Sequence, residues 1–175
     1  MQLKYNRQSG MMGSGKSTIG KLLAKKLKLK FVDTDLIIEK KEKKTIREIF
    51  NKKGEFYFRK VEEEICLEIV HKYNSAIALG GGAFMNDKIR EDILISSNCT
   101  SFWLDVKPSL LKWRLKNVKK RPLLTQSKLE QDLKKIYNKR KEIYNEANFR
   151  ISIGVEPKEE IVNYICRLYE GSKNF

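Results

Sequence analysis

The residues Gly10, Gly15, Lys16 and Ser17 satisfy the spacing G-x-x-x-x-G-K-[ST], which is typical of a phosphate-binding loop. The glycines let backbone N–H groups curl around phosphate oxygens without a Cβ atom in the way. The amphipathic stretch at residues 17–27 predicts a helix whose positive N-terminal end points at those oxygens. In this pattern the lysine supplies a cation to the β- and γ-phosphates, and the serine hydroxyl is a ligand for Mg²⁺. The loop is therefore predicted to bind the phosphates of a nucleotide.

The segment before this loop is a poor match to the buried parallel strand that such a loop normally follows. Residues 3–9, "LKYNRQS", run into Asn6, Arg7 and Gln8, where Val, Ile and Leu are usual. Each missing buried aliphatic side chain costs about 1.5–3 kcal/mol, against a total stability of about 5–15 kcal/mol. Either the N-terminus is altered relative to the natural protein, or a strand forms on backbone hydrogen bonds alone. We expect a strand near residues 3–9.

Charged residues that could take part in phosphoryl transfer follow further along the chain. The stretch "FVDTD" places Asp33 and Asp35 two residues apart at the end of an expected strand. At that spacing both can leave the strand on one side and face the loop; the alternative is a helix N-cap and a surface acid. The stretch "GEFYFRKVEEE" puts Arg59 three and four residues before Glu62 and Glu63 on a helix. An exposed ion pair of little energetic value is the alternative there.

Three later stretches are weak signals individually. The glycine run at residues 79–83, "LGGGA", lets a backbone come close to a ligand, or is only a turn between a strand and a helix. The stretch "RPLL" begins at Arg121. In "RKEIYNEA", the residues Arg140, Tyr144 and Ala147 share one helical face, which is equally typical of core packing beside a solvated arginine.

Short apolar runs alternate with helical patterns and must position these candidates. Strands are expected at residues 29–33, 76–80, 100–106 and 149–153. The stretch "TIRE", residues 45–48, is a capping box that starts a helix. This alternation predicts a parallel sheet covered by helices, an α/β layered fold.

One basic stretch, residues 109–131, departs from the alternation because its middle has little periodicity. A mobile loop that crosses the ligand site and an ordinary solvated connection are both compatible with it.

The composition is that of one globular domain with a basic surface. The chain has 175 residues, 41% hydrophobic and 34% charged, with 37 Lys and Arg against 22 Asp and Glu, a net charge of +15. Such a charge is typical of nucleic-acid binding or of a lysine-rich surface that attracts acidic small molecules. Because the lysines are spread along the chain and no RNA-binding signature with interleaved aromatics appears, we expect no physiological nucleic-acid partner.

Cysteine usage and hydropathy bear on the compartment. The three cysteines, Cys66, Cys99 and Cys166, have no paired spacing and are expected to be reduced and mostly buried. With His71 as the only histidine, we expect no zinc site. No apolar run approaches the roughly 18 residues that span a membrane, and no apolar signal region opens the chain. These observations predict a cytoplasmic protein without membrane contacts.

Taken in order and spacing, the stretches "GMMGSGKST", "FVDTD", "FRKVE", "LGGGA", "RPLL", "RKEIYNEA" and "VEP" resemble those of shikimate kinases over nearly the whole chain. Only the first nine residues depart from the family pattern, in which an apolar strand is usual. The resemblance implies one three-layer P-loop kinase domain over residues 1–175, with a five-stranded parallel sheet flanked by helices. It further implies a substrate-binding region at about 34–62 and a mobile lid at about 114–127.

The resemblance also implies how ATP and Mg²⁺ are bound. The residues implied for the phosphates of ATP are Gly13, Ser14, Gly15, Lys16, Ser17 and Thr18. Ser17 would hold Mg²⁺, and Asp33 would support the ion through water. Arg121, in the lid, would reach the phosphates, while Arg114 and Pro157 would sandwich the adenine ring.

For the acceptor, the resemblance implies that Asp35 binds the hydroxyls of shikimate and accepts a proton from one of them. Arg59 and Arg140 would grip its carboxylate, because a guanidinium offers a planar two-pronged donor face. Gly81 and Gly82 would approach the ring through their backbone.

The implied catalytic residues are Lys16, Arg121 and Asp35. Lys16, Mg²⁺ and Arg121 supply positive charge where the γ-phosphoryl oxygens become negative, and a carboxylate such as Asp35 can accept the hydroxyl proton. Glu62 would be the acid that orients the two arginines.

The expected activity is ATP-dependent phosphorylation of shikimate to shikimate 3-phosphate, in the chorismate pathway to aromatic amino acids, by a monomeric enzyme. Another small-molecule P-loop kinase, such as a gluconate kinase-like enzyme, is the nearest alternative. The set of Arg59, the triple glycine and Arg140 argues against it. A nucleic-acid-binding or regulatory protein that keeps the fold without turnover is an alternative from another class.

Overall fold

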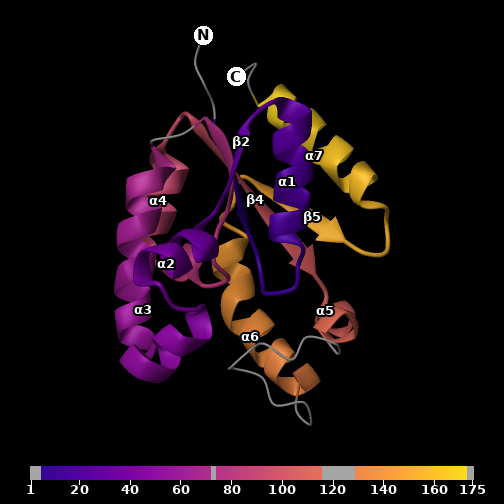
Figure 1. Cartoon of the computed structure of the whole chain (residues 1–175). Coiled ribbons are helices and arrows are strands. Elements are labelled where there is room, and N and C mark those ends of the chain that lie inside the picture. Colours follow the sequence, from indigo (N-terminus) through magenta and orange to yellow (C-terminus); the bar gives the residue numbers. More distant parts are fainter. Residues whose placement is uncertain (1–4, 72–73, 116–128, 173–175) are drawn as a thin grey trace.

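The computed structural model describes residues 5–71, 74–115 and 129–172, and its strands form a five-stranded, all-parallel sheet (Figure 1). The strand order is β2-β3-β1-β4-β5. The strands are β1 (Tyr5–Ser9), β2 (Lys30–Asp33), β3 (Ser75–Ala78), β4 (Cys99–Val106) and β5 (Phe149–Ile153). The expected α/β fold with parallel strands is confirmed, and each expected strand is found within two residues of its predicted bounds.

The strand expected before the phosphate-binding loop is present as β1, at the centre of the sheet. Its backbone pairs with β3 on one side, where Asn6 faces Ala76, and with β4 on the other, where Asn6 faces Thr100. All residues of β3 and β4 are buried. A central strand therefore forms on backbone pairing between two buried strands, although its sequence is not apolar.

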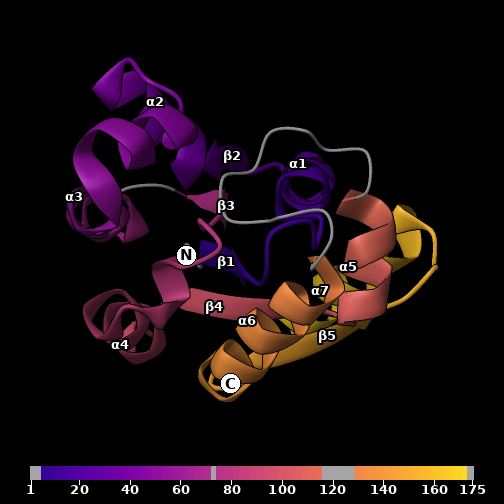
Figure 2. The same ribbon diagram turned by 90° about the horizontal axis from the view of Figure 1, so that it is seen from below.

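Helices cover both faces of the sheet. They are α1 (Lys16–Leu27), α2 (Thr34–Glu42), α3 (Ile46–Val70), η1 (Ala83–Met85, a 3₁₀ turn), α4 (Asp87–Ile95), α5 (Pro108–Leu115), α6 (Leu129–Tyr144) and α7 (Lys158–Gly171). Helices α1 and α7 pack together on one face, whereas α4 and α6 lie on the other (Figures 1 and 2). Among the described residues, no helix is both long enough and apolar enough to cross a bilayer.

The basic stretch predicted as a possible loop is partly helical. Residues 109–115 belong to α5, where Pro108 occupies the first turn and the buried side chains of Leu111 and Leu115 are four residues apart. Arg114, the first residue of the lid expected at about 114–127, thus lies in α5. Residues 116–128 lie outside the described part of the chain, and α6 begins at Leu129.

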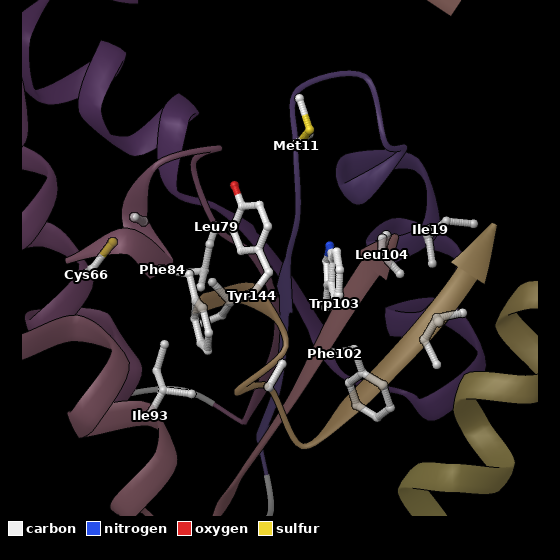
Figure 3. Close-up of a cluster of buried hydrophobic side chains, with 14 of the residues drawn as sticks. Met11, Ile19, Cys66, Leu79, Phe84, Ile93, Phe102, Trp103, Leu104 and Tyr144 are labelled. Carbon is white, nitrogen blue, oxygen red and sulfur yellow. The ribbon is translucent and has the colours of Figure 1, made fainter. Parts of the chain in front are cut away.

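A buried aromatic cluster ties the turn after β3 to the centre of the sheet and to α6 (Figure 3). The ring of Tyr144 lies 5.9 Å from that of Trp103 and 6.5 Å from that of Phe84, measured between ring centroids. These three side chains are at most 2% exposed. The cluster fixes α6 against the segment that carries the glycine run. The three cysteines are free and buried, as expected.

The predicted capping box at the start of α3 is confirmed and supports a test of the fold. The Thr45 hydroxyl accepts from the Glu48 N–H at 3.2 Å, and the Glu48 carboxylate accepts from the Thr45 N–H at 2.8 Å. Thr45→Ala should lower the free energy of unfolding by about 1 kcal/mol, measured by urea denaturation at pH 7. Thr45→Ser keeps the cap and should stay close to the parent protein.

The same cap predicts a dependence on pH. Hydrogen bonds from the Thr45 N–H and hydroxyl hold the pKa of Glu48 below its ordinary value. The stability that they supply is present above the unfolded pKa of a glutamate, about 4.3, and is lost as the pH falls through the lower folded pKa. The difference between Thr45→Ala and the parent should thus shrink in acid; equal stabilities at pH 7 would contradict the assignment.

Candidate active site

The phosphate-binding loop joins β1 to α1 through three glycines in the left-handed region, Gly10 (φ 137°), Gly13 (φ 78°) and Gly15 (φ 100°). A Cβ atom at Gly10 would lie 2.8 Å from the Leu104 carbonyl oxygen, so the loop needs glycine there for space as well as conformation. Helix α1 has no side-chain N-cap. Its first N–H groups are therefore available to an anion, as the motif predicts.

Lys16 folds back over this loop. Its ammonium group donates to the carbonyl oxygens of Gly10 at 2.8 Å and Met11 at 3.1 Å. The loop is closed internally by a hydrogen bond from the Ser14 N–H to the Met11 carbonyl at 3.1 Å. The Lys16 side chain thus lies over the phosphate-binding loop, with its positive charge close to the N-terminus of α1.

Ser17 and Asp33 meet between α1 and β2. The Ser17 hydroxyl donates to one Asp33 carboxylate oxygen at 2.5 Å, and the other oxygen accepts from the Asp35 N–H at 3.1 Å. Asp33 therefore also caps α2, which was the alternative interpretation of this residue. One hydroxyl and one carboxylate beside a phosphate site fit Mg²⁺, which takes few protein ligands and keeps water and phosphate oxygens as the rest.

The prediction that Asp33 and Asp35 both leave the strand on one side is wrong for Asp35. The strand ends at Asp33 and α2 begins at Thr34, so Asp35 is helical and its direction does not follow strand alternation. Asp33 contacts Ser17, whereas the Asp35 carboxylate lies against Gly80. The two carboxylates therefore contact different elements, Asp33 the start of α1 and Asp35 the glycine run.

Charged side chains from other elements pack against two of the glycines that follow β3, Gly80 and Gly82. A Cβ atom at Gly80 would collide with the carboxylates of Glu62 and Asp35, and one at Gly82 would collide with the Arg59 guanidinium. The Gly80 N–H donates to the Thr34 hydroxyl at 2.8 Å in the interior. Glycine at positions 80 and 82 thus leaves the space that charged side chains from α2 and α3 occupy.

Arg59 is held in the site by two acids on its own helix. One terminal nitrogen donates to Glu62 at 2.6 Å, and the other nitrogens donate to Glu55 at 3.0 and 3.2 Å. Glu62 is 2% exposed, and its second oxygen has no hydrogen-bond partner among the described residues. Burial raises the pKa of Glu62, and the charge of Asp35 adds to the rise, while Arg59 and Arg140 oppose it. Glu63, the other acid considered, turns away to Asn86 and Lys88.

Helix α6 contacts the same glycine run from the opposite side. The Gly81 carbonyl oxygen accepts from Arg140 at 2.7 Å and from the Tyr144 hydroxyl at 2.5 Å. Arg140 and Tyr144 do share a helical face, as predicted, and that face carries both a core ring and a polar contact. The prediction is wrong for Ala147, because α6 ends at Tyr144. Thus Asp35, Arg59 and Arg140 approach one backbone turn from three helices.

A separate pocket of about 480 Å³ opens beside the N-terminus of α1. It is lined by the phosphate-binding loop, by α5 with Trp113 and Arg114, and by the segment from Ile153 to Lys158 apart from Pro157. Arg114 donates to the Ser14 carbonyl at 3.5 Å and to the Gly154 carbonyl at 3.2 Å. Trp113 is 72% exposed, so a flat apolar ligand in this pocket could cover its ring.

Most predicted site residues lie at the phosphate-binding loop, at the glycine run or in this pocket, with two exceptions. Arg121 lies outside the described residues, and Pro157 is the N-cap of α7 rather than a lining residue of the pocket. Sequence patterns missed Thr34, Trp113 and Tyr144 as site residues. Tyr144 belongs to the stretch "RKEIYNEA", which was noted in the sequence. Its hydrogen-bond partner, the Gly81 carbonyl, lies 63 residues away, and sequence spacing gives no signal for such a contact.

Comparisons with known proteins agree with this geometry. The family model described as shikimate kinase matches residues 12–170. A shikimate kinase of Sulfurihydrogenibium sp. is 42% identical over 156 residues, which cover 89% of this chain and 92% of that protein. A solved structure, the shikimate kinase of Acinetobacter baumannii in complex with shikimate, superposes with a TM-score of 0.91 at 30% identity, covering 97% of this chain and 94% of that one.

The nearest alternative considered from the sequence has a more distant likeness. A gluconokinase of Sinorhizobium meliloti superposes with a TM-score of 0.56 at 18% identity, which shows a shared fold alone. The family model covers residues 12–170, which include the loop from Met12 onward, the glycine run and the three approaching helices. On these grounds the chain belongs to the shikimate kinase family.

Proposed function

We propose that this chain transfers the γ-phosphoryl group of ATP to shikimate, giving ADP and shikimate 3-phosphate on the chorismate route to aromatic amino acids. The observation that carries the proposal is the convergence of Asp35, Arg59 and Arg140 on the glycine run beside a phosphate-binding loop. Family membership supports it, as does the related structure whose title names shikimate as its ligand. Phosphoryl transfer needs mainly positioning and neutralisation of charge, and this arrangement can supply both.

On the donor side, we assign Gly13, Ser14, Gly15, Lys16, Ser17 and Thr18 to the phosphates of ATP. Lys16 supplies positive charge at the mouth of the loop, next to the open N–H groups of α1. Ser17 would hold Mg²⁺ and Asp33 would support it through water; the ion bridges phosphate oxygens and neutralises developing charge. Arg121 is assigned to the phosphates from its sequence pattern alone.

The pocket between α5 and the segment before α7 suits the adenine ring. Arg114 stands at its wall, tied to the Gly154 carbonyl, and its guanidinium can stack on a base. The exposed ring of Trp113 adds an apolar wall that the sequence pattern did not single out. Pro157 stays a prediction for the opposite side of the base, next to lining residues of the pocket.

On the acceptor side, Arg59 and Arg140 are assigned to the carboxylate of shikimate. Arg59 is pre-oriented by Glu62 and Glu55, so little side-chain entropy is lost when the ligand binds. Asp35 is assigned to the acceptor hydroxyl, whose proton it can take as transfer proceeds. Gly81 and Gly82 would approach the ring closely, and orientation of the hydroxyl contributes several kcal/mol of the rate enhancement.

The remaining expectations are part of the same proposal. The chain would be a single domain over residues 1–175, with a substrate-binding region at about 34–62 and a lid at about 114–127. It would work as a monomer in the cytoplasm, without nucleic-acid or membrane partners. The net charge of +15 would draw in two anionic substrates.

The direct test is ADP release from Mg-ATP with and without shikimate, with gluconate as the control acceptor. Release that depends on shikimate and is not produced by gluconate is the expected result. Release with gluconate alone would move the proposal to another small-molecule kinase. ATP binding without turnover on either acceptor, together with tight nucleic-acid binding at physiological salt, would favour a non-enzymatic role.

Removal of either carboxylate-binding arginine should mainly weaken shikimate binding. Arg59→Ala or Arg140→Ala removes a charged partner worth about 2–5 kcal/mol, which corresponds to a rise in the shikimate Kd of at least about 30-fold. Calorimetric titration with shikimate measures this, and circular dichroism checks that each variant is folded. Arg47→Ala, on the exposed surface of α3, is the matched control. Unchanged shikimate affinity in both site variants would refute the acceptor site.

Replacement of the proposed base should separate binding from turnover. Asp35→Asn keeps the size of the side chain but removes the negative charge, so kcat should fall by about 10²- to 10⁴-fold. ATP affinity should change little, because the Asp35 side chain is not assigned to the nucleotide. Steady-state kinetics at saturating shikimate and an ATP titration give the two numbers. Near-normal kcat would remove Asp35 from the mechanism.

A further inference from the structure

Helix α6 holds the glycine run at the Gly81 carbonyl, through two hydrogen bonds. Arg140 and the Tyr144 hydroxyl donate to the same oxygen at 2.7 and 2.5 Å. A carbonyl oxygen has two lone pairs, so this acceptor is saturated by α6. The orientation of the Gly81–Gly82 peptide unit is therefore set from one side of the run.

Among the described residues, the Gly81 carbonyl takes no part in the backbone hydrogen bonds of the turn that surrounds it. Successive i→i+3 hydrogen bonds join Ala83 to Gly80, Met85 to Gly82 and Asn86 to Ala83, at 3.0–3.1 Å. The Gly81 carbonyl is left out of this ladder and turns to α6 instead. A glycine has little intrinsic preference between such orientations, so the side-chain donors decide.

The orientation of this carbonyl fixes the direction of the next N–H. The peptide unit is planar and, like every described peptide bond, not cis, so the Gly82 N–H points opposite to the Gly81 carbonyl. It points away from α6, and within the described part of the chain it has no acceptor. The Arg59 guanidinium lies against the Gly82 Cα on the face that a side chain would otherwise occupy. An N–H donor is thus presented next to a proposed carboxylate-binding group.

Tyr144 is built to hold this position rigidly. Its side chain is 1% exposed and its ring packs near Trp103 and Phe84 (Figure 3). Burial raises the pKa of Tyr144, while the positive charge of Arg140 works against the rise. The hydroxyl therefore stays protonated at neutral pH and can donate.

The two donors differ in what else they must do. Arg140 is half-buried, and under the proposed function its guanidinium also engages the carboxylate of the acceptor. If Arg140 were the only donor to the Gly81 carbonyl, the orientation of this carbonyl would depend on a side chain that also binds the acceptor. Tyr144 has no such second task, since its ring is enclosed by the core.

We propose that Tyr144 is a positioning residue: its hydroxyl holds the Gly81 carbonyl toward α6, keeps the Gly82 N–H directed at the acceptor, and leaves Arg140 free to move onto the carboxylate. The ligand class is a small hydroxylated carboxylic acid, and in this respect the inference rests on the proposed function. Tyr144 does not touch the reacting atoms; it acts through the glycine run.

Tyr144→Phe tests this directly, because it keeps the buried ring and removes only the hydroxyl. The shikimate KM should rise about 3- to 10-fold, the range that the loss of one net hydrogen bond gives, while the KM for ATP stays within twofold. Tyr137→Phe is the matched control, since Tyr137 lies on the same helix near Trp103 but away from the glycine run. It should leave both constants unchanged. A fall in melting temperature with an unchanged shikimate KM would overturn the proposal and leave a purely structural role.

A second measurement separates this inference from the proposed function. In ¹⁵N-labelled protein without any ligand, the Gly82 amide signal should shift in Tyr144→Phe, because the Gly81 carbonyl loses one of its two donors, and should be unchanged in Tyr137→Phe. This measurement is made without ligand and therefore does not depend on the identity of the acceptor. If the parent protein releases no ADP with shikimate, the proposed function fails; if the Gly82 signal is unmoved in Tyr144→Phe, the positioning role fails.

Discussion

The absence of side chains at Gly80 and Gly82 is the constraint on which the site depends. The space that a Cβ atom would take at Gly80 holds the carboxylates of Glu62 and Asp35, and at Gly82 it holds the Arg59 guanidinium. The Gly81 carbonyl, between these two positions, accepts hydrogen bonds from two side chains of α6. Helices α2, α3 and α6 can therefore bring opposite charges to within contact distance of one turn, and a side chain at Gly80 or Gly82 would displace the Glu62, Asp35 and Arg59 groups.

The same turn explains how the site tolerates its buried acid. Glu62 is enclosed, which raises its pKa, and the Arg59 guanidinium at 2.6 Å compensates for part of the cost of burying its charge. In turn Arg59 is fixed in direction by Glu62 and Glu55, so its orientation does not depend on a ligand. A buried acid with no other evident role thus has a physical one: it keeps the Arg59 guanidinium in place beside the glycine run.

The sequence predicted the elements and the local motifs well because their signals are short-range. The phosphate-binding spacing at residues 10–17 and the capping box at Thr45 depend on neighbours within a few residues. The strand β1 shows the limit: its polar sequence argued against it, and pairing with two buried strands overrode that preference. Contacts such as Thr34 to Gly80 or Tyr144 to Gly81 join segments 46 and 63 residues apart, and no periodicity reports them.

The central claim is that the acceptor binds at the glycine run between Arg59 and Arg140, and a crystal structure with shikimate and Mg-ADP tests it most directly. The account predicts the carboxylate of shikimate against both guanidinium groups, one ring hydroxyl beside Asp35, and the Gly81 carbonyl still bound by Tyr144. The adenine ring should lie in the pocket beside Arg114. Shikimate bound elsewhere, or bound with its carboxylate away from both arginines, would contradict the account.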